Sequence, residues 1–206
     1  MTSYIYTIVE GHGEVQAVPL LLRRLAHEHL QNYDLHVFPA HRVPRGRILR
    51  GDHLERAAEL GRRRIVESGG RGGVLLLLDA DNDCPATLGP QLLARLSNVI
   101  SDLPLSVVLA KREYEAWFLA AAHSLRRLSN VREDAEPPPE PEEIRGAKEY
   151  LTRALLVPGA VYSETVDQVS LSAVMDLVEA LRCRSFKKLC CDLRKLLRWA
   201  MQAQER

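Results

Sequence analysis

The chain has 206 residues, of which 46% are hydrophobic and 27% are charged, and its formal net charge is +1. This composition is ordinary for a globular protein, and the near-neutral balance lacks the strong positive charge of a dedicated DNA-binding domain. No apolar stretch approaches the roughly 18 residues of a membrane span, and Met1 to Ser3 lead into a predicted strand without a basic leader segment. We therefore expect a cytoplasmic protein that does not contact a membrane.

The first half of the chain alternates predicted strands with predicted helices. The strands are expected over residues 4–9, 35–39, 74–78 and 105–110, and the helices over 20–31, 52–67 and 85–101. Near-continuous apolar runs suit parallel strands that are covered on both faces, and a helix between successive strands favours a parallel sheet. The pattern predicts an α/β, Rossmann-like fold with a mostly parallel four-stranded sheet flanked by helices.

The second half is predicted to be a helical extension of that domain. Residues 1–130 are expected to form the α/β domain, 131–143 an exposed acidic, proline-rich linker or loop, and 144–206 a helical extension packed on the core. Helical patterns cover residues 143–156, 167–181 and 185–204, and Ser185 is a suitable N-cap for the last of them.

Acidic side chains follow two of the predicted strands. Glu10 follows the first strand, and Asp79 and Asp81 follow the third. Parallel sheets bind ligands outside the carboxyl ends of their strands, and clustered carboxylates suit Mg²⁺ or Mn²⁺ because these cations neutralise their repulsion. In the alternative interpretation, Asp81 or Asp83 is only the N-cap of the helix that begins near Pro85.

Two further groups of charged residues extend this candidate site. Glu113 and Glu115 follow the fourth strand, so they belong to the same edge of the sheet. One predicted loop carries four arginines that would position the phosphates of a nucleic acid, although a solvated turn would look the same in sequence: Arg42, Arg45, Arg47 and Arg50.

These features together resemble the TOPRIM fold, which topoisomerases, primases and OLD-family nucleases share. The detailed resemblance is to small bacterial OLD-nuclease-like TOPRIM proteins, and it covers nearly the whole chain. Four segments carry it: Val9-Glu10-Gly11-His12-Gly13-Glu14-Val15, Asp79-Ala80-Asp81, Glu113-Tyr114-Glu115-Ala116-Trp117 and Ser185-Phe186-Lys187.

The resemblance implies a role for each acidic residue. Glu10 would do acid–base work at the phosphoryl centre, and Asp79 and Asp81 would bind Mg²⁺. Glu14 would join the same metal cluster, with Glu113 or Glu115 as a further ligand. The catalytic candidates are thus Glu10, Asp79, Asp81 and Glu113, and the metal-ligand candidates are Glu10, Glu14, Asp79, Asp81 and Glu115, for one or two Mg²⁺ or Mn²⁺ ions.

The function expected from this is metal-dependent phosphodiester chemistry on DNA or RNA, as a nuclease in bacterial defence or repair. OLD proteins usually carry an ATPase domain, and the chain has no Gly-x-x-x-x-Gly-Lys-Ser/Thr motif, so any ATPase would be a separate subunit. The alternative is a non-catalytic TOPRIM-like interaction subunit of a defence or repair complex. A Rossmann-type nucleotide enzyme is disfavoured because Gly11-His12-Gly13 is only a fragment of Gly-x-Gly-x-x-Gly.

Overall fold

A parallel sheet forms the centre of the structure, a computed structural model that describes residues 2–202, with side chains to residue 200. Strands β1 (Ser3–Val9), β2 (Leu35–Val37), β4 (Gly72–Asp79) and β5 (Leu105–Ala110) are arranged in the order β2-β1-β4-β5. The two-residue strand β3 (His41–Arg42) also pairs with β1, and every pairing is parallel. The predicted α/β fold with a mostly parallel sheet is confirmed.

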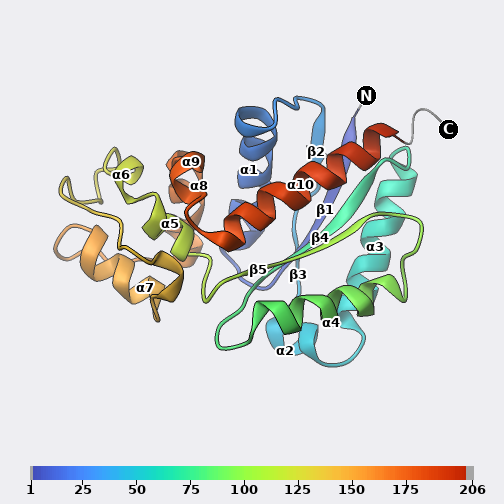
Figure 1. The fold of residues 1–206 in the computed structure, drawn as a ribbon, viewed down its shortest axis with the longest axis horizontal. Helices are drawn as coiled ribbons and strands as arrows, with labels where there is room; N and C mark the ends of the chain where they lie inside the picture. The colour runs from blue at the N-terminus through green and yellow to red at the C-terminus, as the bar shows by residue number, and fades with distance from the viewer. Residues whose placement is uncertain (1, 203–206) are drawn as a thin grey trace.

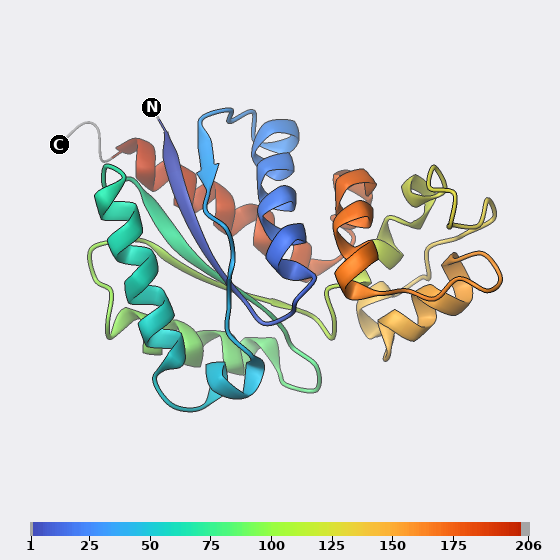
Figure 2. The same ribbon diagram turned by 180° about the vertical axis from the view of Figure 1, so that it is seen from behind.

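Helices cover both faces of the sheet. Helices α1 (Glu14–Arg24) and α10 (Arg184–Gln202) share one hydrophobic core with the sheet, and α3 (His53–Glu67) and α4 (Pro85–Ser97) share the core on the other face. Figure 1 shows α10 running across the sheet, and Figure 2 shows α1 beside β2 from behind. Every residue of β4 is buried between the two layers, which explains its uninterrupted apolar sequence.

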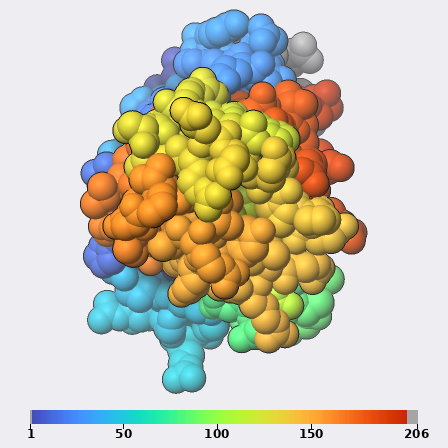
Figure 3. Space-filling model, turned by 90° about the vertical axis from the view of Figure 1, so that its left-hand side faces the viewer, coloured from blue at the N-terminus to red at the C-terminus, as the bar shows by residue number. Residues whose placement is uncertain are grey.

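The remaining helices are short, and most of them form a lobe at the carboxyl end of the sheet (Figure 1). In Figure 3 this lobe appears in yellow and orange, with the cyan segment that contains α2 below it. No helix in the described part of the chain is both long and apolar enough to cross a membrane. The short elements are α2 (Arg45–Leu49), α5 (Ala116–Ala120), α6 (Ala122–Leu125), α7 (Ala147–Tyr150), α8 (Glu164–Val174) and α9 (Leu177–Ala180), with a 3-10 turn at Pro141–Glu143 and π-helical turns at Leu25–His29 and Leu151–Leu155.

The helix predicted over residues 167–181 is in fact two helices, α8 and α9. The chain leaves the helical conformation at Met175, where ψ is 139°. Asp176 then starts α9, because its carboxylate accepts hydrogen bonds from the backbone N–H groups of Val178 and Glu179. An Asp inside a helical apolar pattern was therefore the cap of a new helix.

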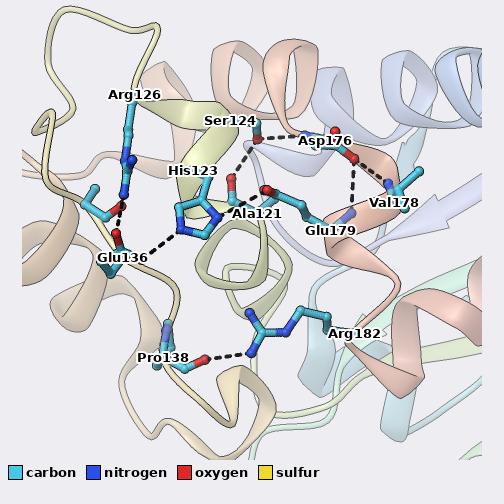
Figure 4. A network of polar contacts seen from close by, with 11 residues as sticks. Ala121, His123, Ser124, Arg126, Glu136, Pro138, Asp176, Val178, Glu179 and Arg182 are labelled. Atoms are coloured by element: carbon cyan, nitrogen blue, oxygen red, sulfur yellow. Dashed lines mark hydrogen bonds and ion pairs between the residues drawn. The ribbon is translucent and has the colours of Figure 1, made fainter.

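The acidic, proline-rich segment is not the exposed stretch that its composition predicts. Glu136 forms an ion pair with Arg126 at 2.6 Å and a hydrogen bond with Nε2 of His123 at 2.8 Å. Arg182 donates a hydrogen bond to the carbonyl of Pro138, whose side chain is buried (Figure 4). These contacts tie the segment to α6 and to the turn after α9, so it lies against the lobe as an ordered loop.

Glu142, in the same segment, caps the last helix. Its buried carboxylate accepts hydrogen bonds from the backbone N–H groups of Arg184 and Ser185, both at 2.9 Å. The prediction that Ser185 is the N-cap is wrong, because α10 already begins at Arg184. The Ser185 hydroxyl instead donates to Glu142 and accepts from the indole N–H of Trp117. A carboxylate at this position also favours the positive end of the helix dipole.

Replacing Glu142 with alanine should lower the free energy of unfolding by about 1–3 kcal/mol, because two backbone N–H groups and a hydroxyl lose a buried acceptor. Glu140→Ala is the matched control, since Glu140 is exposed in the same acidic segment. Urea denaturation of both variants measures the effect. Equal stabilities for the two variants would contradict the capping role.

Candidate functional site

Four carboxyl groups meet at the carboxyl end of the sheet. Glu10 follows β1, Asp79 is the last residue of β4, Glu14 is the first residue of α1, and Glu115 precedes α5. Each of the other three raises the pKa of Asp79, which places all four in one electrostatic environment. We refer to Glu10, Glu14, Asp79 and Glu115 as the acidic cluster.

Asp79 lies at the centre of the acidic cluster. Its side chain is buried, and one carboxylate oxygen accepts a hydrogen bond from the backbone N–H of Tyr114 at 2.7 Å. Burial raises the pKa of Asp79 well above its ordinary value, and the negative charges of Glu14, Glu115 and Glu10 raise it further. The carboxyl group is therefore held in place by the turn after β5, although its charge is disfavoured there.

Glu14 closes the loop between β1 and α1 around the cluster. Oε2 of Glu14 accepts hydrogen bonds from the backbone N–H groups of Glu10 at 3.0 Å and Gly11 at 2.9 Å. These bonds favour the charged form, but burial outweighs them and raises the pKa of Glu14 to about 8. The Glu14 carboxyl group therefore has a clear structural role besides any part in binding a ligand.

Glu115, and not Glu113, is the acid that the β5–α5 turn contributes to the cluster. Glu115 is completely buried, accepts a hydrogen bond from the Tyr162 hydroxyl at 2.7 Å, and leaves its Oε2 without a hydrogen-bond partner. Burial raises its pKa to about 7, against the opposing influence of Lys148 and Tyr162. Glu113 accepts from the backbone N–H of Ala147 at the start of α7, and its charge raises the pKa of Glu115, so its catalytic role stays a prediction.

Glu10 and Asp81 form the accessible side of the site. The Oε2 atom of Glu10 is buried without a hydrogen-bond partner, and burial raises the pKa of Glu10 although Arg45 opposes the shift. Asp81 is exposed at the rim and has a left-handed backbone with φ of 50°, and its N–H donates to the carbonyl of Arg112, where φ is 64°. Two non-glycine residues with strained backbone facing each other mark this rim as a specialised structure.

Neither Asp81 nor Asp83 caps the helix that follows. The N-cap position of α4 belongs to Cys84, and neither aspartate accepts a hydrogen bond from the start of that helix. The two aspartates instead form ion pairs with Arg45, at 3.3 Å from Asp81 and 2.5 Å from Asp83. The capping interpretation of these acids is therefore wrong.

Two basic side chains border the acidic cluster. Arg45 also lies 3.7 Å from Glu10 and donates to the backbone carbonyl of Asp79. Lys148 pairs with Glu164 at 3.1 Å; burial lowers its pKa, but Glu115, Glu164 and Asp79 raise it more strongly, so the ammonium stays charged. Lys148 also favours the charged forms of Glu10 and Glu115. The site thus combines concentrated negative charge with two cations at its edge.

The predicted arginine loop is partly helical, and its members have separate surroundings. Arg45 enters the acidic site, whereas Arg42 belongs to β3 and its buried Nε lacks a hydrogen-bond partner. Arg47 on α2 and Arg50 after it are exposed. Sequence reasoning did not find Lys148 or Tyr162, because both come from the helical extension and no spacing links them to the strand ends.

The acidic cluster fits a divalent cation in charge and in donor type. Its oxygens are hard donors, and two of them, on Glu10 and Glu115, are buried without a hydrogen-bond partner. Among the described residues, however, no three His, Cys, Asp or Glu side chains already converge in the arrangement of a metal site. Binding a cation therefore requires side-chain reorientation, with Arg45 leaving Glu10 as the simplest change.

A family model described as Domain of unknown function (DUF4276) matches residues 9–194 of the chain. The match contains every residue of the acidic cluster as well as Arg45, Lys148 and Tyr162. No curated protein and no solved structure matches the chain significantly.

In metal-free buffer, the free energy of unfolding should fall as the pH rises from about 5 to about 8. The native pKa values of Glu14 and Glu115 are about 8 and about 7, above the value of about 4.3 for an unfolded glutamate. The native state therefore binds more protons than the unfolded state within this window, and it loses that advantage as they dissociate.

Urea denaturation in EDTA at several pH values measures this slope. Glu115→Gln should flatten it, because the amide cannot lose a proton, while Glu133→Gln at an exposed position should leave it unchanged. A stability that rises steadily from pH 5 to pH 8 would show that the cluster is not strained by its own charge.

Proposed function

We propose that this chain, which belongs to the family Domain of unknown function (DUF4276), is a divalent-metal-dependent enzyme that cleaves phosphodiester bonds in nucleic acid. The observation that carries the proposal is the acidic cluster: four mutually repelling carboxyl groups, gathered where parallel sheets bind ligands. Carboxyl groups with strongly shifted pKa values at such an edge are typical of functional sites. A purely structural role would favour carboxyl groups that lie apart, because their charges then repel each other less.

The metal would be one or two Mg²⁺ or Mn²⁺ ions held by Glu10, Asp79 and Glu115, with Glu14 beside them. When bound, such ions activate water and stabilise the charge of the leaving oxygen. Glu10 has an oxygen without a hydrogen-bond partner and a raised pKa, so it suits proton transfer at the reacting phosphate. The TOPRIM resemblance, which is part of this proposal, implies that Asp81 at the rim would be a further metal ligand.

The basic residues at the edge would receive the substrate. Arg45 is half-buried beside Glu10, and a metal ion there would release its guanidinium group toward a phosphate. Lys148 lines a cavity of about 590 Å³ that also contains His12, Arg42 and Tyr162, next to the acidic cluster. The side chains around this cavity would neutralise and orient a phosphate group while the acids hold the cation.

A non-catalytic interaction subunit is the second candidate. The contact network of Arg45 favours it, since one guanidinium group already pairs with Glu10, Asp81 and Asp83. In that case the acids and Arg45 would be a structural ion-pair network. For both candidates, we propose on the TOPRIM resemblance a role in bacterial defence or repair. The protein would act in the cytoplasm, with a separate ATPase subunit.

Purified protein should cleave plasmid or single-stranded nucleic acid in Mg²⁺ or Mn²⁺ and not in EDTA. Glu10→Gln and Asp79→Asn should each lower the rate by about 100-fold or more, and the double variant should be little worse, because the residues of one metal centre act as a unit. Asp134→Asn, at an exposed position in the acidic loop, is the control and should retain full activity. Cleavage that Glu10→Gln leaves unchanged would point to a contaminating nuclease.

Arg45→Ala distinguishes the two candidates without an activity measurement. If the acids form a metal site, removing the competing guanidinium should strengthen Mn²⁺ binding about tenfold, since one opposing charge no longer has to be displaced. Arg50→Ala, at an exposed position after α2, should leave the affinity unchanged. Calorimetric titration with Mn²⁺ gives both values, and absence of binding in wild type and Arg45→Ala alike would favour the interaction subunit.

A further inference from the structure

A second cavity, of about 270 Å³, lies between β3, α2 and α3. Its polar lining consists of His41, Arg42, Arg47, His53 and Arg56, and no acidic side chain lines it. We refer to it as the basic cavity. Arg42 also lines the 590 Å³ cavity beside the acidic cluster, so one guanidinium group borders both cavities.

The positive charge of the basic cavity is poorly neutralised. The Nε atom of Arg42 is buried and has no hydrogen-bond partner. Within the described residues, the side chains of Arg47 and His53 take part in no hydrogen bond or ion pair. Arg56 pairs only with Asp52, and both side chains are more than half exposed, so solvent screens that contact. Three guanidinium groups around one cavity repel each other unless an anion joins them.

Other arginines of the chain show how a structural guanidinium group is held. Arg95, on α4, donates hydrogen bonds to both carboxylate oxygens of Glu55 and to the backbone carbonyls of Ile48 and Gly51. Because Glu55 lies on α3, these bonds link α4 to α3. Arg42 and Arg47 have no comparable partners although they lie nearby. Their donors are free for a ligand with several acceptor oxygens.

His41 adds a neutral donor to the same cavity. The Tyr6 hydroxyl and Nδ1 of His41 lie 2.7 Å apart and share a hydrogen bond in which either atom can be the donor. Burial and the nearby Arg64 lower the pKa of His41, which favours the neutral ring. In the tautomer in which Tyr6 is the donor, the ring proton is on Nε2, where it can be donated to an anion.

We propose that the basic cavity binds a phosphate group of the polynucleotide substrate, adjacent to the phosphate that reacts at the acidic cluster. The ligand's identity as substrate rests on the proposed function, whereas the anion site rests on the cavity and its unpartnered donors. A tetrahedral oxyanion matches the planar, two-donor geometry of guanidinium groups. The phosphate is either a terminal monoester or an internal diester, and Arg42 connects its site to the acidic centre.

The test uses full-length protein in EDTA, so that binding is measured without metal or cleavage. Inorganic phosphate and pyrophosphate are titrated by calorimetry, followed by short oligonucleotides with and without a 5′-phosphate as competitors. The double variant Arg47→Gln/Arg56→Gln should weaken phosphate binding about tenfold or more, since it removes two exposed cavity arginines without touching the core. Arg194→Gln is the control: it removes an exposed arginine of α10, outside the cavity, and should change the affinity less than twofold.

A terminal monoester and an internal diester are distinguished by how well the two oligonucleotides compete with inorganic phosphate. An oligonucleotide with a 5′-phosphate that displaces phosphate better than its unphosphorylated copy supports a terminal monoester, and equal displacement by both supports an internal diester. Phosphate binding that is absent, or equal in wild type and the double variant, overturns the basic cavity as an anion site even if the enzyme cleaves nucleic acid. Phosphate binding that neither oligonucleotide displaces overturns the polynucleotide assignment. Cavity-dependent competition without any cleavage upholds the cavity and counts against the proposed function alone.

Discussion

Repulsion among the buried carboxyl groups of Glu10, Glu14, Asp79 and Glu115 is the constraint on which the carboxyl end of this molecule depends. Three of the four are held by specific donors: the N–H of Tyr114, the N–H groups of the loop after β1, and the Tyr162 hydroxyl. These donors fix the positions of the acids without cancelling their charge. Burial raises the pKa of each, and repulsion from neighbouring carboxylates, among them Asp81 beside Glu10 and Glu113 beside Glu115, raises it further. Under the proposed function, a divalent cation would relieve this repulsion.

The helical lobe completes this site and is tied to the sheet by acidic residues of its own. Glu113 anchors the start of α7, which places Lys148 beside the cluster, and Glu142 anchors the start of α10. Tyr162, from the segment before α8, reaches Glu115. The acidic, proline-rich loop therefore belongs to the folded structure, because its carboxylates cap helices and pair with basic side chains of the lobe.

The acidic cluster and the basic cavity lie close to each other at this end of the molecule. Arg45 is drawn into the acidic cluster, whereas Arg42, three residues earlier, faces the basic cavity and lacks partners. The proposed function requires one site for a negatively charged substrate and another for a divalent cation, and the β3–α2 segment carries an arginine at each of these proposed sites.

The apolar runs and the acids that end them determined the parallel sheet and the position of Glu10 and Asp79, because strand period and strand ends are local properties of the chain. Local pattern could not choose between Glu113 and Glu115, two residues apart, since the choice depends on Ala147 and Tyr162 more than 30 residues away. The same holds for Arg45, for Lys148 and for the cap that Glu142 provides. Their roles come from contacts across the fold, where burial and the nearest charge decide what a side chain does, and those are set only when distant segments pack together.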